Sequence, residues 1–315
     1  MKKNHFTLLS VVLFSLVFNI SAKNNTEALK EKILSNADLS GESLKELLSD
    51  DYADDDDCEE IEETKGAEYK RDVPFTPEMY GFIEKYFNRN ITTEDELSAY
   101  YNKALSAGES IYEDEYSKLI NKARCNYFYG MQLMSTFDLS NIENTDFTSD
   151  AESETLNEIA GCYYDTAIEY AEKALEIKNG SDAWTILSHS ISANCTAKNS
   201  KYMLANALKV RSYAKKACKL DSKNGSAKFL ITAQDIYAPY PFCKLNKGRK
   251  EMLSYLSNSS LHLEKYDRFN ISCAVAYSWY KKKKYSKSLS WYKKCREIYP
   301  NNYSVNMMIE KIENK

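Results

Sequence analysis

Glycine, proline and histidine are scarce in this chain, with nine, five and three copies among 315 residues. Because glycine and proline supply most tight turns, so few copies argue against a fold of many short strands. Alanine, leucine, lysine, glutamate and 25 tyrosines are abundant instead. Most of these residues favour long helices, so the composition predicts an all-α fold. With 43% hydrophobic residues, the chain can also bury a sizeable core.

The motifs of common catalytic sites are missing as well. No glycine-rich phosphate loop, GxSxG or HExxH occurs. Beyond the N-terminus only His189 and His262 could activate a nucleophile, and His189 lies in a helical stretch where a packing role is expected. Neither histidine pairs with cysteine at metal-ligand spacing, and nothing places two of the many carboxylates across a cleft. We therefore expect no enzyme activity, no metal and no cofactor.

The N-terminus has the pattern of a signal peptide, residues 1–22. Lys2 and Lys3 precede an apolar stretch from Phe6 to Ile20, and the small residue Ala22 suits a signal peptidase. The stretch is shorter than the roughly 20 residues that span a bilayer, although a retained anchor is the alternative. Because no cysteine lies near Ala22, a lipid-modified N-terminal cysteine is not indicated. The pattern predicts a periplasmic or secreted protein.

Eight cysteines follow the predicted signal peptide. An even number in an exported protein suggests disulfides, but the spacings are wide and irregular and no CxxC occurs. Several cysteines stand where a helix needs a small buried residue. Bridges and buried thiols therefore both remain open. The cysteines are Cys58, Cys125, Cys162, Cys195, Cys218, Cys243, Cys273 and Cys295.

Charge divides the chain into an acidic and a basic half. The net charge is −20 over residues 23–160 and +14 over residues 161–315. Such polarity suggests that the halves face each other or different partners. Residues 23–73 contain a dense acidic run from Asp50 to Glu60, and we expect this segment to be largely disordered and unpacked. A calcium loop is the alternative for the run, but the glycine at its bend is missing.

Residues 74–160 carry strong helix signals and form a helical region with possible degenerate hairpins. Thr76, followed by Pro77 and Glu78, is a typical helix start. Thr93 with Glu96 resembles a capping box. A longer helix is predicted from Glu113 to Ser135, and the Thr-, Asp-, Ser- and Asn-rich residues 136–153 are predicted to form a polar loop.

In residues 161–315, small and apolar residues recur at steps of three and four. Such spacing places them along one side of a helix, which must then be buried against a neighbour. Helical segments alternate with short breaks, as in stacked antiparallel helix pairs. The stripes are Tyr164, Ala167, Ala171 and Ala174; Met203, Ala207, Val210, Ala214, Ala217 and Leu220; and Tyr285, Ser288, Tyr292, Cys295 and Ile298.

One helix pair, residues 269–302, carries a more specific pattern. Val275, Ala276 and Trp279 form a large-small-aromatic set on its first helix, the second helix carries the last stripe above, and Pro300 follows. This pattern resembles the tetratricopeptide repeat. Weaker matches to the second helix of that family are Ala167 to Ile177, Ala214 to Asp221, and a worn copy with Gly248, Met252 and Tyr255.

The resemblance implies an α-solenoid of stacked antiparallel hairpins that ends in a capping helix over residues 302–314. The spacing departs from the family pattern. Equivalent positions Ala174, Ala217, Tyr255 and Cys295 lie 43, 38 and 40 residues apart, whereas the family unit has 34. We therefore expect long or irregular connections, and an unrelated helical bundle is the alternative.

The resemblance also implies a binding surface. In the last repeat the first helix would line the concave face, with Asn270, Cys273, Tyr277 and Tyr280 directed into the groove. Asn270, Tyr277 and Tyr280 are the predicted partner-binding residues, although the tyrosines could instead pack on a neighbouring hairpin. The expected function is an exported scaffold or adaptor that holds a protein or peptide segment. The alternative is a ligand-binding accessory subunit of a solute transporter, similar to the T component of TRAP-type transporters.

Lys281 to Lys284 form the densest basic cluster of the chain. Such a cluster is typically a solvated turn between helices. Nucleic acid is not an expected partner of an exported protein, whereas an anionic envelope surface is a reasonable one for peripheral contact. The sequence does not indicate an oligomeric state.

Overall fold

The computed structural model describes residues 71–91, 93–140, 150–238 and 243–315. The predicted signal peptide and the acidic run, with its calcium-loop alternative, lie outside these ranges. Within them the chain forms eleven α-helices and no strand, which confirms the all-α prediction. The helices are α4 (Pro77–Phe87), α5 (Glu94–Ile111), α6 (Glu115–Ser140), α7 (Asp150–Ile177), α8 (Ser181–Ala197), α9 (Ser200–Leu220), α10 (Gly225–Tyr237), α11 (Leu245–Ser257), α12 (Lys265–Lys281), α13 (Tyr285–Ile298) and α14 (Tyr303–Glu313).

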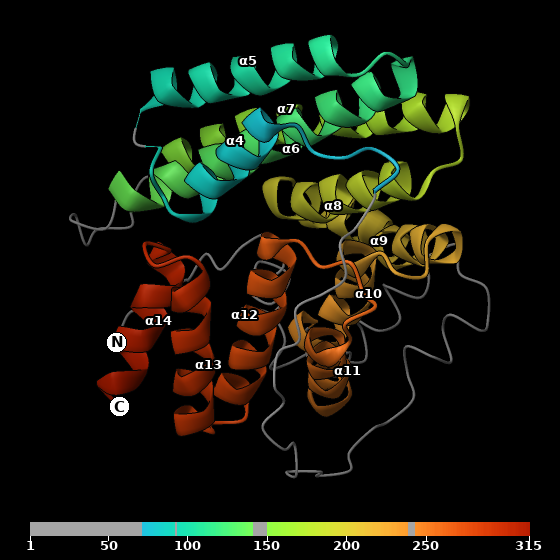
Figure 1. The fold of residues 1–315 in the computed structure, drawn as a ribbon. Coiled ribbons are helices and arrows are strands. Elements are labelled where there is room, and N and C mark those ends of the chain that lie inside the picture. The colour runs from blue at the N-terminus through green and yellow to red at the C-terminus, as the bar shows by residue number, and fades with distance from the viewer. Residues whose placement is uncertain (1–70, 92, 141–149, 239–242) are drawn as a thin grey trace.

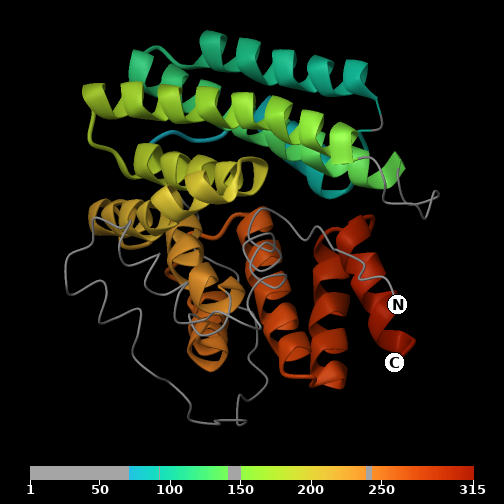
Figure 2. The same cartoon turned by 180° about the vertical axis from the view of Figure 1, so that it is seen from behind.

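Each helix packs against the next one in the chain, from α4 to α14, as in a solenoid of helix pairs. Helices two positions apart also touch, such as α6 with α8 and α10 with α12. In Figures 1 and 2, α5, α6 and α7 form one layer, α8 and α9 lie beside it, and α10 to α14 run roughly across that direction. The stack therefore changes direction after α9.

Side-chain caps fix where several helices begin. The hydroxyl of Thr76 accepts a hydrogen bond from the Met79 amide at 3.1 Å, and that of Thr93 accepts from the Glu96 amide at 3.2 Å, as predicted. The Asn224 side chain caps α10 and also donates to Ser181 at 3.0 Å and to Thr185 at 2.9 Å, so that one residue joins α10 to α8.

Most residues of the predicted apolar stripes lie in the core, because small side chains let neighbouring helices approach closely, but Leu220 at the end of α9 is 47% exposed. Ala167, Ala171 and Ala174 are fully buried between α7 and its neighbours, and Tyr292, Cys295 and Ser288 are buried on α13. Helix α12 is buried on nearly every side, with Trp279 only 2% exposed. The predicted terminal helix is present as α14.

Two helix boundaries differ from the sequence prediction. Helix α6 continues to Ser140 and α7 begins at Asp150, so both ends of the polar loop predicted over residues 136–153 are helical, while residues 141–149 lie outside the described ranges. The short polar side chains there lower helix propensity, but only by a few tenths of a kcal/mol each, and long helices on both sides offset that deficit.

The N-terminal segment from Arg71 to Thr76, here called the strap, runs across the inner side of the molecule before α4 begins. Arg71 is 6% exposed and Val73 is fully buried. The expectation of an unpacked segment over residues 23–73 is therefore wrong for its last three residues. The strap stays in place for two reasons. Val73 is buried, and Arg71 forms ion pairs with Asp182 of α8 and with Glu264 just before α12.

Two findings on cysteines and on membrane spans concern the described residues only. None of the seven cysteines there is part of a disulfide, and Cys125, Cys195, Cys273 and Cys295 are buried. No helix in these ranges is long and apolar enough to cross a membrane.

Candidate functional site

Two neighbouring helices present the same spacing of residues to the centre of the molecule. Positions i, i+3, i+4 and i+7 of a helix share one face, and in both helices the first of the four is charged. Both sets line one cavity, here called the central hollow. The sets are Arg124, Tyr127, Phe128 and Met131 on α6, and Asp182, Thr185, Ile186 and His189 on α8.

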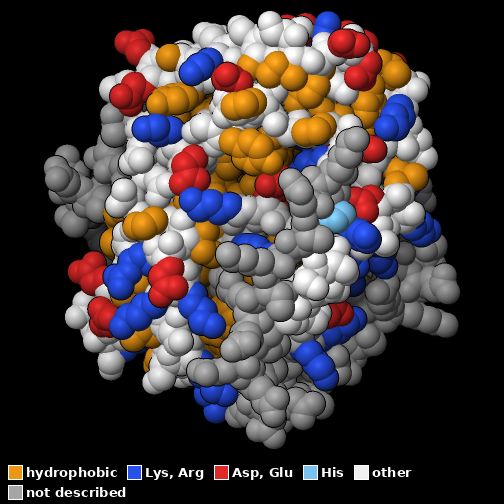
Figure 3. Space-filling model, in the orientation of Figure 1, with side chains coloured by type: hydrophobic (Ala, Val, Ile, Leu, Met, Phe, Trp, Pro, Cys, Tyr) orange, Lys and Arg blue, Asp and Glu red, His pale blue; other side chains and the backbone are white. Residues whose placement is uncertain are grey.

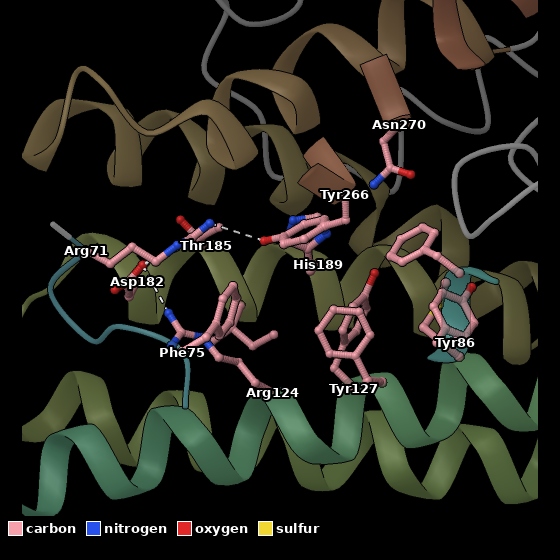
Figure 4. A pocket seen from close by; sticks show the side chains of 14 residues that line it. Arg71, Phe75, Tyr86, Arg124, Tyr127, Asp182, Thr185, His189, Tyr266 and Asn270 are labelled. Atoms are coloured by element: carbon pink, nitrogen blue, oxygen red, sulfur yellow. Dashed lines mark hydrogen bonds and ion pairs between the residues drawn. The ribbon is translucent and has the colours of Figure 1, made fainter. Parts of the chain in front are cut away.

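The strap, α4 and α12 complete the walls of the central hollow. They add Arg71, Phe75, Tyr86 with Phe87, and Tyr266 with Asn270. The cavity is small, with about 30 Å³ open to the centres of water-sized groups, and it opens in part to solvent. Figure 3 shows hydrophobic side chains gathered at a recess in the middle of one face of the molecule. Figure 4 shows Asn270 reaching in from α12, opposite Tyr127.

Arg71 is the centre of an ionic network on one side of the hollow (Figure 4). Its guanidinium group lies 2.9 Å from Glu264, 3.5 Å from Asp182 and 3.7 Å from Asp267. It also donates to the Tyr266 hydroxyl at 3.3 Å. Burial alone lowers the pKa of Arg71, but Tyr266 and the three carboxylates raise it well above its ordinary value. Arg71 therefore stays charged and joins the strap to α8 and α12.

Arg124 supports the same network from α6. Its guanidinium group donates to the Val73 carbonyl at 2.7 Å and lies 3.2 Å from Asp182. Both guanidinium carbons lie against the Phe75 ring, at 4.7 Å for Arg71 and 4.4 Å for Arg124. Cation–π contacts of this kind are strongest where water is excluded. The Phe75 side chain is thereby fixed as one wall of the hollow.

Asp267 is fully buried behind Arg71, at the start of α12. Burial raises the pKa of Asp267 to about 6, although Arg71 and a hydrogen bond from Ser226 act in the opposite direction. Its carboxylate also accepts from the Glu264 amide at 3.0 Å and so caps the helix. Two guanidinium groups thus face three carboxylates, and the network has no surplus positive charge for an anionic ligand.

His189 provides a polar atom without a partner in the wall of the hollow. Its Nε2 atom is buried and no described residue hydrogen-bonds to it. Burial, with the nearby positive charge of Arg71, lowers the pKa of His189 to about 3, so the ring is neutral. A neutral imidazole offers one donor and one acceptor. A buried polar atom without a partner is costly, which is a reason to expect a bound group or water opposite it.

Aromatic rings make up most of the remaining wall. Tyr266 is stacked with Phe87 at 6.1 Å and meets the edge of Phe128 at 6.2 Å, measured between ring centroids. Tyr127 contacts the His189 ring at 5.5 Å. These contacts involve α4, α6, α8 and α12. Rings held by so many helices keep a fixed shape, as expected for a site that is formed before a ligand binds.

The structure separates the three predicted partner-binding residues. Asn270 lines the hollow, where its side chain is half-buried. Tyr277 is stacked on Tyr237 of α10 at 5.2 Å. Tyr280 lies 5.8 Å from Tyr285 of α13, and Cys273 is buried. The groove-facing set expected from helical spacing is therefore divided between the hollow, the neighbouring helices and the core.

Sequence reasoning missed Arg71, Arg124 and Asp182. Arg71 belongs to the segment predicted to be unpacked, and its partners lie 111 to 196 residues later in the chain. A signal was nevertheless present on α6 and α8, because each apolar stripe opens with a charged residue that a buried face would not ordinarily contain. Such a charge indicates an ion pair across the interface.

No group of three or more His, Cys, Asp or Glu side chains in the described part of the chain is arranged to hold a metal ion. Comparisons with models of protein families, with curated proteins and with solved structures found no match. The central hollow itself combines aromatic walls, a balanced ionic network, and neutral polar groups at Asn270 and His189.

Proposed function

We propose that the protein is an exported, tetratricopeptide-like interaction protein of the bacterial cell envelope that recognises its partner through the central hollow. It acts as a scaffold or adaptor and not as an enzyme. The observation that carries the proposal is the pairing of aromatic walls with two neutral polar side chains: Asn270, and His189, whose buried Nε2 atom has no described hydrogen-bond partner. Apolar pockets with a few convergent polar groups are typical of binding sites.

The size and polarity of the hollow favour a protein segment that inserts one apolar or aromatic side chain. With about 30 Å³ open to water-sized groups, the hollow is too small for a folded element, so a partner would present a single side chain at its mouth. The amide of Asn270 can both donate to and accept from a peptide group at the entrance. Because the charges of Arg71 and Arg124 are balanced by carboxylates, we expect the inserted group to be neutral.

The strap supplies a reason to retain a second candidate function. The strap closes one side of the hollow through Arg71 and Phe75. A cavity closed on one side suits a small ligand better than a peptide that passes through it. A ligand-binding accessory subunit of a solute transporter is this second candidate. The two candidates share the site and differ in what occupies it.

Crosslinking from the entrance of the hollow tests the proposal. A photoreactive amino acid at position 270 should capture one polypeptide in cell-envelope extract, and the same group at the exposed position 301 should not. Ile186→Phe, which fills the hollow, should abolish the capture. Native mass spectrometry of the protein purified from its own envelope distinguishes the second candidate, which predicts a small added mass lost on denaturation. Equal capture from positions 270 and 301 would contradict both candidates.

A further inference from the structure

A second feature, independent of the central hollow, lies at the far end of the last hairpin. It consists of the turn Lys281–Lys284 with Tyr280, Tyr285 and Lys315, here called the basic turn. Residues 281–296 contain eight Lys and Arg and no acidic residue. Lysine and arginine side chains gather over α13 and α14 in Figure 3, with a few acidic ones among them. In Figure 1 the turn and the C-terminus lie at the same end of the molecule.

The basic turn has a defined shape. The Lys315 ammonium group donates to the hydroxyls of Tyr280 and Tyr285, both at 3.1 Å. It also lies 4.7 and 4.4 Å from the centres of their rings. Backbone hydrogen bonds from Lys283 to Tyr280 and from Lys284 to Trp279 close the end of α12. The turn therefore keeps lysine ammonium groups and tyrosine rings together at the surface. Lysine and tyrosine are the kinds of residue that are enriched at membrane–water interfaces.

Lys283 shows that the charge is not required by the turn itself. Its φ is 60°, in the left-handed region that glycine and asparagine adopt far more easily. A glycine there would build the same turn with less strain. A lysine at this position gives up stability for a fourth consecutive positive charge, and backbone strain of this kind is found where function requires a particular side chain.

We propose that the basic turn docks the protein onto the phosphate headgroups of an anionic membrane. Each lysine near such a surface contributes through electrostatic attraction, and Tyr280 and Tyr285 suit the boundary between headgroups and water. Lys281, Lys283 and Lys284 are exposed and Lys282 is half-buried at the turn between α12 and α13, so a flat charged surface can approach the turn. A folded acidic protein would need a matching depression to do the same.

Vesicle sedimentation tests this inference with the chain begun at Lys23, so that the apolar N-terminus does not itself insert. The wild type should sediment with phosphatidylcholine–phosphatidylglycerol vesicles and not with phosphatidylcholine alone. K281Q/K282Q/K283Q/K284Q should weaken that binding by at least about tenfold. The matched control, K201Q/K209Q/K219Q/K223Q, removes the same charge from exposed lysines on and just after α9 and should bind within about twofold of wild type.

Lys283→Gly separates the docking role from a structural one. It should raise the melting temperature, because the left-handed strain is relieved, and at the same time weaken binding to anionic vesicles roughly fivefold. Equal losses in the two quadruple variants would mean that net charge and not the basic turn is responsible. That result, or wild-type protein that ignores both vesicle types and binds dissolved polyglutamate instead, would overturn the proposal.

Discussion

The guanidinium group of Arg71 lies 2.9 Å from the carboxylate of Glu264, a residue 193 positions later in the chain. Through this contact the start of the described chain is joined to the start of α12. The same arginine reaches Asp182 on α8, so one side chain joins both parts of the helix stack. The contact also places Phe75 and the rest of the strap in the wall of the central hollow.

Truncation just before the strap and truncation just after it should therefore affect stability very differently. A chain that begins at Lys70 retains Arg71 and should melt at nearly the same temperature as a chain that begins at Lys23. A chain that begins at Pro77 leaves Glu264 and Asp267 without their buried cation and should be about 3–5 kcal/mol less stable. Thermal unfolding by circular dichroism measures both. Equal stability of the two truncated chains would mean that the strap does not hold the fold together.

Asp267 should give the protein an unusual dependence of stability on pH. Its pKa is about 6 in the folded protein and about 3.9 when unfolded, so the folded state binds its proton more tightly. This contribution is fully present below about pH 3.9 and is lost as the pH rises through 6. The free energy of unfolding of wild type should thus fall by about 2–3 kcal/mol relative to Asp267→Asn between pH 4 and 7. Urea titrations at several pH values measure the difference, and a constant difference would refute this assignment.

His189 should remain neutral throughout the physiological range. Burial and the nearby charge of Arg71 lower its pKa to about 3. In NMR spectra of the chain begun at Lys23, which contains only His189 and His262, the His189 ring signal should show no titration between pH 8 and pH 5. In urea both histidines should titrate near the ordinary value of about 6.5. A His189 transition near pH 6 in the folded protein would show that the hollow is open to water.

The two tryptophans of the last hairpin should differ sharply in their effect on stability. Trp279 is 2% exposed and lies under the guanidinium group of Arg249 at 3.6 Å, so Trp279→Ala should cost about 3–5 kcal/mol. Trp291 is partly exposed on α13 beside Lys294, and Trp291→Ala should cost less than about 1 kcal/mol. Chemical denaturation of both variants makes the comparison. Similar losses of stability in the two variants would mean that the repeat positions assigned to α12 and α13 are wrong.

Local patterns predicted most of the fold, because periodicity and capping depend on residues close in sequence. Spacing predicts the alanine stripe of α7, residue type predicts the Thr76 and Thr93 caps, and the resemblance to the tetratricopeptide repeat implies the burial of Trp279. The ends of α6 and α7 were not predicted, since weak helix formers such as serine and aspartate can continue a helix that packing already stabilises.

The central hollow could be predicted only in part. Helical spacing identified Asn270 as a residue on the open side of α12, and it does line the hollow. The same spacing also selected Tyr277 and Tyr280, which pack on α10 and α13, because spacing defines a helix face but not the neighbour that covers it. The charged residues that open the stripes of α6 and α8 indicate ion pairs across an interface. Which distant residue each charge meets depends on how the helices pack, and a single sequence does not show that.

A titration with small neutral probes tests the central claim most directly. N-acetylphenylalaninamide imitates one aromatic side chain with its peptide groups, and His189 and His262 report on two different places in the folded protein. We predict a saturable shift of the His189 ring signal, no shift of His262, and binding at least about tenfold weaker in Asn270→Ala or for N-acetylphenylalanine, which carries a charge. A His189 signal that does not move, or that moves only together with His262, would contradict a binding site in the central hollow.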